Sequence, residues 1–160
     1  MIKVGDTLPD ATLKLMGSNS PESFETAELN DKTAVIFAVP GAFTPTCSAA
    51  HLPGFVTLFD EITAAGVELI ACISVNDAFV MDAWGKSANA ENLLMLADGN
   101  ATFTKAVGLD KDATAYHMGV RSSRYAMIVK NGVVEHLAID EAGLKETSAE
   151  AILSVLKNQA

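Results

Sequence analysis

The spacing of apolar and polar positions predicts strands and helices that alternate along the chain. Two nearly continuous apolar runs, at residues 33–39 and 67–75, are typical of strands buried on both faces of a sheet. Between them, apolar positions three and four residues apart predict a helix that begins near Cys47. Pro53 and Gly54 lie inside this helix and predict that it is kinked or split.

A second group of patterns follows the run at residues 67–75. Asn131-Gly132 is the strongest two-residue signal for a β-hairpin, and it separates two apolar segments. Residues 110–123 have no clear period and are predicted to form a loop. The predicted elements in this part of the chain are helices at residues 77–87 and 101–107 and strands at residues 93–97, 125–130 and 133–139.

The two ends of the chain carry shorter signals. Alternation at residues 11–15 predicts a short strand, paired in a hairpin with residues 23–26. Thr147 and Glu150 have the spacing of a capping box and predict the start of a C-terminal amphipathic helix. The order strand–helix–strand–helix, then hairpin, then helix predicts one α/β domain over residues 1–160, with a central mixed sheet flanked by helices.

Composition and charge narrow the class of protein. With 49% apolar and 19% charged residues, the chain is typical of a globular domain. The net charge of −9 argues against nucleic acid or an anionic membrane surface as a partner. The N-terminus lacks the layout of a signal peptide, and no apolar run approaches the about 18 residues of a membrane span. We therefore expect a soluble, cytoplasmic protein in a reducing compartment.

The stretch after the first apolar run carries the candidate chemistry. Pro40 and Gly41 end the predicted strand, and Thr44 can cap a helix whose first turn contains Cys47. A helix N-terminus carries a partial positive charge, which favours the thiolate, the nucleophilic form of cysteine. The alternative is an inert buried cysteine, as most free cysteines are. The helix-start position favours a reactive thiol.

Pro40, Thr44 and Cys47 form the pattern Pro-x-x-x-Thr-x-x-Cys, in which the chain resembles the peroxiredoxins. The resemblance extends over nearly the whole chain and is greatest to the type II, or peroxiredoxin-5-like, group. It implies a thioredoxin-like fold. The stretches that carry it are residues 40–55, 72–84, 96–109, 119–129 and 147–153.

The resemblance implies a thiol-dependent peroxidase that reduces hydrogen peroxide and small alkyl hydroperoxides. Cys47 would attack the peroxide and become a sulfenic acid. Thr44 would direct its hydroxyl to the thiolate or to the peroxide, and Pro40 and Gly41 would shape the pocket. The catalytic arginine of the family falls on Arg124, whose forked guanidinium can contact sulfur and oxygen together.

The roles of two further side chains stay open at this stage. His51 lies four residues after Cys47, on the same helix face, and either helps to hold the thiolate or forms a hydrogen bond near a dimer contact. Arg121, three residues before Arg124, is interpreted by default as a surface arginine or as one that supports the site without touching the substrate. His117 and His136 show no ligand spacing with Cys, Asp or Glu, so we expect no metal and no cofactor.

The recycling of Cys47 is expected to need an external thiol. Some members of the group carry a resolving cysteine near the C-terminus, but residues 143–148 contain none. Cys72 lies within a buried strand and is interpreted as structural, not as a resolving cysteine. The expected reductant is glutathione with glutaredoxin, or thioredoxin. An alternative is a peroxide sensor or redox relay that passes its oxidation to a partner protein.

The resemblance also implies a homodimer. The type II members form dimers through the edge near the active-site loops. Here that edge would carry Phe43, residues 76–79 and Trp84, although packing in the core is the alternative for Trp84.

Overall fold

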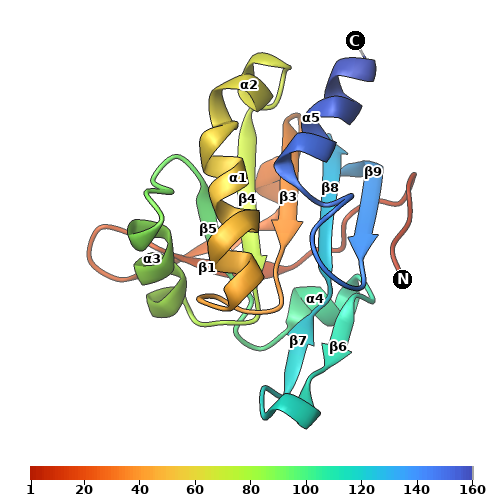
Figure 1. The fold of residues 1–160 in the computed structure, drawn as a ribbon. Helices are drawn as coiled ribbons and strands as arrows, with labels where there is room; N and C mark the ends of the chain where they lie inside the picture. Colours follow the sequence, from red (N-terminus) through yellow and green to blue (C-terminus); the bar gives the residue numbers. More distant parts are fainter. Residues whose placement is uncertain (160) are drawn as a thin grey trace.

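The computed structural model describes residues 1–159 and is built on a seven-stranded mixed sheet. The strands lie in the order β2-β1-β5-β4-β3-β8-β9, and a separate two-stranded sheet, β6-β7, projects from the body (Figure 1). The strands are β1 (Thr12–Met16), β2 (Pro21–Glu25), β3 (Thr33–Ala38), β4 (Leu69–Ser74), β5 (Leu94–Ala97), β6 (Asp110–Asp112), β7 (Val120–Ser122), β8 (Arg124–Lys130) and β9 (Val133–Asp140).

The helices cover both faces of the main sheet. Helices α1 and α2 follow one another end to end over one face with α5 beside them, whereas α4 lies on the far side in this view (Figure 1). None of the helices at residues 1–159 is long and apolar enough to cross a membrane. The α-helices are α1 (Leu52–Thr57), α2 (Phe59–Ala64), α3 (Ala78–Ser87), α4 (Thr102–Ala106) and α5 (Ala149–Asn158).

The three central strands are parallel, and their alternate residues feed two separate cores. β4 pairs in parallel with β3 and with β5, while β8 runs antiparallel to β3. Successive side chains of a strand point to opposite faces. In β3, Val35 and Phe37 therefore join the core beneath the helices α1, α2 and α5, whereas Ala34 and Ile36 join the core on the other face. This two-sided burial explains the nearly continuous apolar runs in the sequence.

Most of the expected strands and helices are present, with ends that differ by one to two residues. The predicted hairpin at Asn131-Gly132 is confirmed, and both residues have positive φ, 50° and 76°, as a tight primed turn requires. The N-terminal hairpin is confirmed too, with Leu13 opposite Phe24. The mixed α/β architecture agrees with the predicted fold class.

Two local predictions were wrong, and a third was incomplete. The helix expected from Cys47 is divided just before Pro53, where a π-helix at residues 47–51 is followed by α1, and it is broken a second time at Leu58. Residues 110–123 are not a plain loop, since β6 and β7 pair there. Ser148, not Thr147, caps α5, and its hydroxyl accepts a hydrogen bond from the N–H of Ala151.

Candidate active site

Cys47 lies in the first helical turn after β3, above the carboxyl end of that strand. Helical backbone begins at Pro45, and from Cys47 to His51 it is wound as a π-helix, in which Leu52 N–H donates to the carbonyl of Cys47. The helix-start position agrees with the sequence analysis. The thiol is not exposed, however, because its relative accessible surface is 0%. It packs in the core together with Phe37 and Leu52.

Arg124 meets Cys47 from the neighbouring part of the sheet. It is the first residue of β8 and points to the same face as Ala126 and Ile128, under the helix that carries the cysteine. Its Nη2 donates to Cys47 Sγ at 3.2 Å. Its Nη1 donates to His51 Nδ1 at 2.7 Å. The fork of one buried guanidinium therefore bridges a sulfur and an imidazole.

The polar contacts of His51 are with Arg124 and with the backbone of Thr147. Its ring is buried against Phe37 and Phe55, at centroid distances of 4.9 and 5.7 Å. Its Nε2 lies 2.9 Å from the carbonyl oxygen of Thr147. A carbonyl can only accept and a guanidinium can only donate, so Nε2 carries the hydrogen and Nδ1 accepts from Arg124.

The protonation state of His51 agrees with this pattern of hydrogen bonds. Burial and, to a lesser extent, the positive charge of Arg124 together lower the pKa of His51 to about 4, against the opposing effects of Thr147 and Asp140. The ring is therefore neutral at pH 7. A protonated ring would present a hydrogen at Nδ1 toward Arg124 and would break the contact that holds the guanidinium.

Thr44, Pro40 and Gly41 form the turn between β3 and the helix. The hydroxyl of Thr44 donates to the carbonyl of Gly41 at 2.7 Å, and no N–H of the helical turn that follows donates to its oxygen. A Cβ on Gly41 would lie 3.1 Å from Thr44 Cγ2 and 3.4 Å from Met118 Cε, which leaves little room for a side chain. Pro40 is half-buried beside it. The oxygen of Thr44 keeps its lone pairs free for a hydrogen-bond donor.

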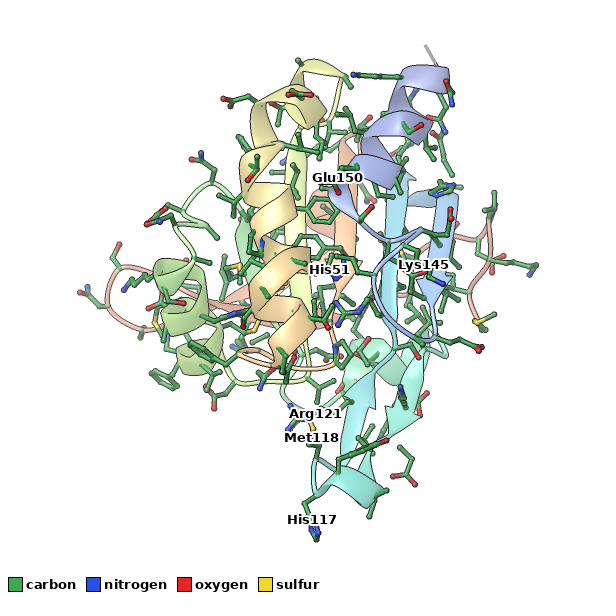
Figure 2. The ribbon with its side chains drawn as sticks, in the orientation of Figure 1. His51, His117, Met118, Arg121, Lys145 and Glu150 are labelled. Atoms are coloured by element: carbon green, nitrogen blue, oxygen red, sulfur yellow. The ribbon has the colours of Figure 1, made fainter. Side chains whose placement is uncertain are left out.

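Arg121 has a different task from Arg124. Its Nε donates to the carbonyl of Met118 at 2.8 Å, and its Nη1 donates to the carbonyl of Val75 at 2.7 Å. The second bond connects the β6–β7 arm, residues 110–122, to the residue that follows β4. Figure 2 shows Arg121 near the N-terminal end of the helix that carries His51. Arg121 therefore uses its guanidinium on two backbone carbonyls.

Cys72 is a core residue of β4. It stands opposite Phe37 in the register of the parallel pair, its side chain is buried, and both cysteines are free thiols. Burial raises the pKa of the Cys72 thiol well above its ordinary value. This neutral thiol is a poor nucleophile, since the thiolate is the reactive form.

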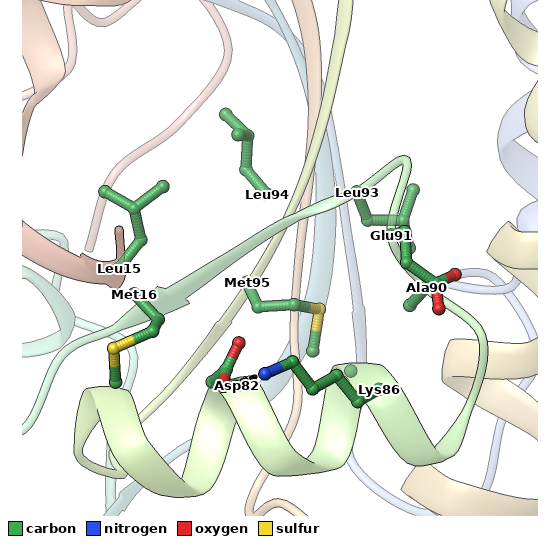
Figure 3. Close-up of a pocket in the computed structure, with 10 residues that line it drawn as sticks. Leu15, Met16, Asp82, Lys86, Ala90, Glu91, Leu93, Leu94 and Met95 are labelled. Carbon is green, nitrogen blue, oxygen red and sulfur yellow. Dashed lines mark ion pairs between the residues drawn. The ribbon is translucent and has the colours of Figure 1, made fainter. Parts of the chain in front are cut away.

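No group of three or more His, Cys, Asp or Glu residues within positions 1–159 could hold a metal ion. A cavity of about 330 Å³ lies away from the cysteine, between β1, α3 and β5 (Figure 3). It is lined mainly by apolar side chains, with an ion pair of 2.9 Å between Lys86 and Asp82. This cavity includes neither Cys47 nor Arg124.

Two members of the site could not be recognised from the sequence. The backbone carbonyl of Thr147 orients His51, and Asp140 in turn accepts hydrogen bonds from the N–H and the hydroxyl of Thr147. The spacing of Thr147 and Glu150 predicts a helix cap instead, because that role and a bond to a carboxylate use the same hydroxyl. The cross-strand position of Asp140, opposite Arg124, becomes visible only once β8 and β9 are in register.

Comparison with known proteins gives consistent results. The family described as Redoxin matches residues 3–153. Peroxiredoxin-2E-2, chloroplastic, of Oryza sativa subsp. japonica is 49% identical over 97% of this chain and 72% of its own length. The hybrid peroxiredoxin hyPrx5 of Haemophilus influenzae is 40% identical over 97% of this chain and 66% of its own length.

Solved structures agree with the fold. The reduced Prx3 of Vibrio vulnificus in complex with H₂O₂ superposes with a TM-score of 0.95 at 52% identity, covering 98% of this chain and 99% of that one. Peroxiredoxin 5 of Alvinella pompejana gives a TM-score of 0.87 at 32% identity, covering 99% and 100%. The chain therefore belongs to the redoxin family and is a thioredoxin-like peroxiredoxin of the type II, peroxiredoxin-5-like group, a thiol-dependent peroxidase.

Proposed function

We propose that Cys47 is the peroxidatic cysteine and that Arg124 stabilises both its thiolate and the oxygen that leaves the peroxide. The observation that carries this proposal is the 3.2 Å contact between Arg124 Nη2 and Cys47 Sγ inside a buried site. Charge in such a site is stabilised only by groups that are already in place. A guanidinium held on its other arm by His51 meets that requirement.

The reaction assigned to Cys47 is a displacement at oxygen. The thiolate attacks the nearer peroxide oxygen, an S–O bond forms and the O–O bond breaks. Cys47 is oxidised to a sulfenic acid, and the peroxide is reduced to water or an alcohol once the leaving oxygen takes up a proton. Arg124 is the group beside the sulfur that can donate to the leaving oxygen.

Thr44 is proposed to orient the peroxide. Its hydroxyl hydrogen is used on the carbonyl of Gly41, so its oxygen can only accept. A peroxide O–H can therefore donate to Thr44 while the same molecule accepts from Arg124. The buried position of Cys47 favours small substrates, namely hydrogen peroxide and small alkyl hydroperoxides. In support, the similar protein of Vibrio vulnificus has been solved in complex with H₂O₂.

The proposed reductant is an external thiol, with glutathione and glutaredoxin favoured over thioredoxin. The chain has only two cysteines, and Cys72 is a buried, neutral thiol in β4. In a cytoplasmic, reducing compartment, glutathione would condense with the sulfenic acid of Cys47 to give a mixed disulfide and water. A second thiol would then release the Cys47 thiol and form a disulfide with the first glutathione.

After one equivalent of hydrogen peroxide followed by glutathione, mass spectrometry should find a glutathione adduct on Cys47. The expected mass gain is absent from Cys72, because burial keeps that thiol protonated and out of reach. Peroxide consumption with glutathione plus glutaredoxin should exceed that with thioredoxin plus its reductase. A disulfide between Cys47 and Cys72, with turnover lost in Cys72→Ser, would show that the chain resolves its own sulfenic acid.

We also propose a homodimer that uses the surface beside the active-site turn. Phe43 and Phe79 are exposed by 55% and 66%, unusual values for phenylalanine. Trp84 was expected on the same surface but is 1% exposed, so it belongs to the core. Sedimentation at micromolar concentration should show a dimer that Phe43→Ser or Phe79→Ser weakens. A monomer at every concentration, in both redox states, would contradict the proposal.

A further inference from the structure

We propose that Asp140 is a positioning residue for the oxidation of Cys47, acting through Thr147, His51 and Arg124. The inference rests on the assignment of Cys47 and Arg124 made above. Asp140 is the last residue of β9 and the register partner of Arg124 in β8. Its carboxylate accepts hydrogen bonds from the loop that follows, residues 141–148, rather than from that neighbour.

The carboxylate of Asp140 holds this loop through hydrogen bonds from three consecutive residues, 145–147, an arrangement called the clamp below. Its Oδ2 accepts from Lys145 N–H at 2.8 Å, from Thr147 N–H at 3.0 Å and from Thr147 Oγ1 at 2.7 Å. Its Oδ1 accepts from Glu146 N–H at 3.2 Å. Burial by itself would raise the pKa of Asp140, but these four hydrogen bonds outweigh it and lower the pKa to about 2. The clamp is therefore charged at neutral pH.

The clamp determines where the carbonyl of Thr147 points. On its N-terminal side, Thr147 is tied to Asp140 by two hydrogen bonds. On its C-terminal side, Ser148 begins α5, and its hydroxyl accepts from Ala151 N–H at 3.1 Å. The peptide unit between Thr147 and Ser148 is thus held from both ends. Its carbonyl oxygen lies 2.9 Å from His51 Nε2. Figure 2 shows His51 and the loop with Lys145 beside each other.

The direction of that carbonyl selects the tautomer of His51. Because the carbonyl can only accept, the hydrogen of the neutral ring resides on Nε2 and the lone pair remains on Nδ1. That lone pair accepts from Arg124 Nη1 at 2.7 Å, and the other arm of the guanidinium then donates to Cys47 Sγ at 3.2 Å. In the other tautomer, Nδ1–H would face the N–H of Arg124 and push the fork away from the sulfur.

The chain contains a matched control for this arrangement. Asp98 follows β5 as Asp140 ends β9, and it is also buried. It accepts from Phe103 N–H at 3.2 Å, Thr104 N–H at 2.8 Å and Thr104 Oγ1 at 2.7 Å. Both aspartates thus accept hydrogen bonds from the N–H and the hydroxyl of a threonine, Thr104 in the first turn of α4 and Thr147 just before α5. Only the clamp of Asp140 continues through a carbonyl to His51.

The first test compares Asp140→Asn with Asp98→Asn by stopped-flow oxidation with hydrogen peroxide. In Asp140→Asn, an NH₂ group replaces one of the two accepting oxygens and faces N–H donors of residues 145–147. The loop then loses hydrogen bonds, and the carbonyl of Thr147 is no longer held in place. The second-order rate constant should fall about tenfold, as expected for a misplaced catalytic group. Asp98→Asn should leave it within about twofold while lowering the free energy of unfolding to a similar extent.

The second readout is the tautomer of His51, measured by its ¹⁵N chemical shifts. The wild-type ring should carry its hydrogen on Nε2, Asp140→Asn should show a mixture of tautomers, and Asp98→Asn should match the wild type. A merely structural role of Asp140 would not produce this difference, because both aspartates stabilise their loops in the same way.

A double-mutant cycle with His51→Phe measures whether Asp140 acts on Cys47 through His51. Phenylalanine keeps the packing against Phe37 and Phe55 but makes neither hydrogen bond, so Asp140→Asn should add no further slowing in that background. Should Asp140→Asn fail to fold, Thr147→Val, which removes only the Oγ1 bond, takes its place with a smaller effect of the same kind.

Two results would overturn the proposal. One is a folded Asp140→Asn protein with unchanged oxidation rate and unchanged His51 tautomer. The other is equal slowing by Asp140→Asn with and without His51, which would mean that Asp140 acts by another route. A wild-type protein that peroxide does not oxidise at Cys47 would instead refute the assignment of the nucleophile.

Discussion

Replacing Cys47 with serine should abolish peroxidase activity and leave the fold intact. Turnover is expected to fall by about three orders of magnitude or more, because a serine hydroxyl does not ionise at neutral pH and no general base lies beside it. The side chain is fully buried, so the smaller oxygen fits, and it can accept the hydrogen bond that Arg124 Nη2 now donates to sulfur. Steady-state peroxide consumption measures the loss, and circular dichroism checks the fold.

Cys72→Ser is the matched control for this experiment. Both cysteines are buried in the same core, but only Cys47 contacts a guanidinium. The Cys72 variant should keep most of its activity and lose stability, because it places a hydroxyl in an apolar strand. Retention of about a tenth of wild-type turnover by Cys47→Ser would refute Cys47 as the nucleophile.

The second large effect is expected for Arg124→Lys. A lysine keeps the charge but has a single ammonium nitrogen, so it cannot contact Cys47 Sγ and His51 Nδ1 with separate arms as Arg124 does. The rate constant of Cys47 oxidation should fall about a hundredfold, the usual size for loss of a donor to a developing oxyanion. The ultraviolet absorbance of the thiolate at neutral pH should also decrease.

Arg121→Lys serves as the control for charge alone. Arg121 donates to the carbonyls of Met118 and Val75, so its replacement should loosen the β6–β7 arm and change the oxidation rate much less. If the Arg124 variant oxidised as fast as the wild type and the Arg121 variant did not, the stabilising cation would be Arg121. Stopped-flow measurements on the two variants decide between these outcomes.

The parts of the fold that sequence patterns predicted are those with local signals. The buried strands β3 and β4 are apolar except for Thr33 and Ser74 at their ends, and Asn131 and Gly132 adopt the positive φ values that their turn type requires. The break at Leu58 has no such signal. The β6–β7 pair has no such signal either, since each strand has only three residues and those of β6, Asp110–Asp112, are all charged and exposed.

The sequence predicted those residues of the site that belong to one short motif. Thr44 and Cys47 lie three residues apart, but Arg124 is 77 residues from Cys47, and its position came from resemblance. His51 had the right helix face and an open role, because its partner is a backbone carbonyl and any residue has one. The burial of Cys47 was not foreseen either, since spacing along a helix does not reveal what packs above it.

The hydrogen bond between Trp84 and Ser48 gives the site its own optical probe. Trp84 is the only tryptophan of the chain, and its Nε1–H donates at 3.0 Å to the hydroxyl of the residue that follows Cys47. Indole emission depends on what the N–H meets and on how much water reaches the ring. All tryptophan fluorescence of this protein therefore comes from a ring that is hydrogen-bonded to the neighbour of the nucleophile, so a change in that turn can be followed in real time without any label.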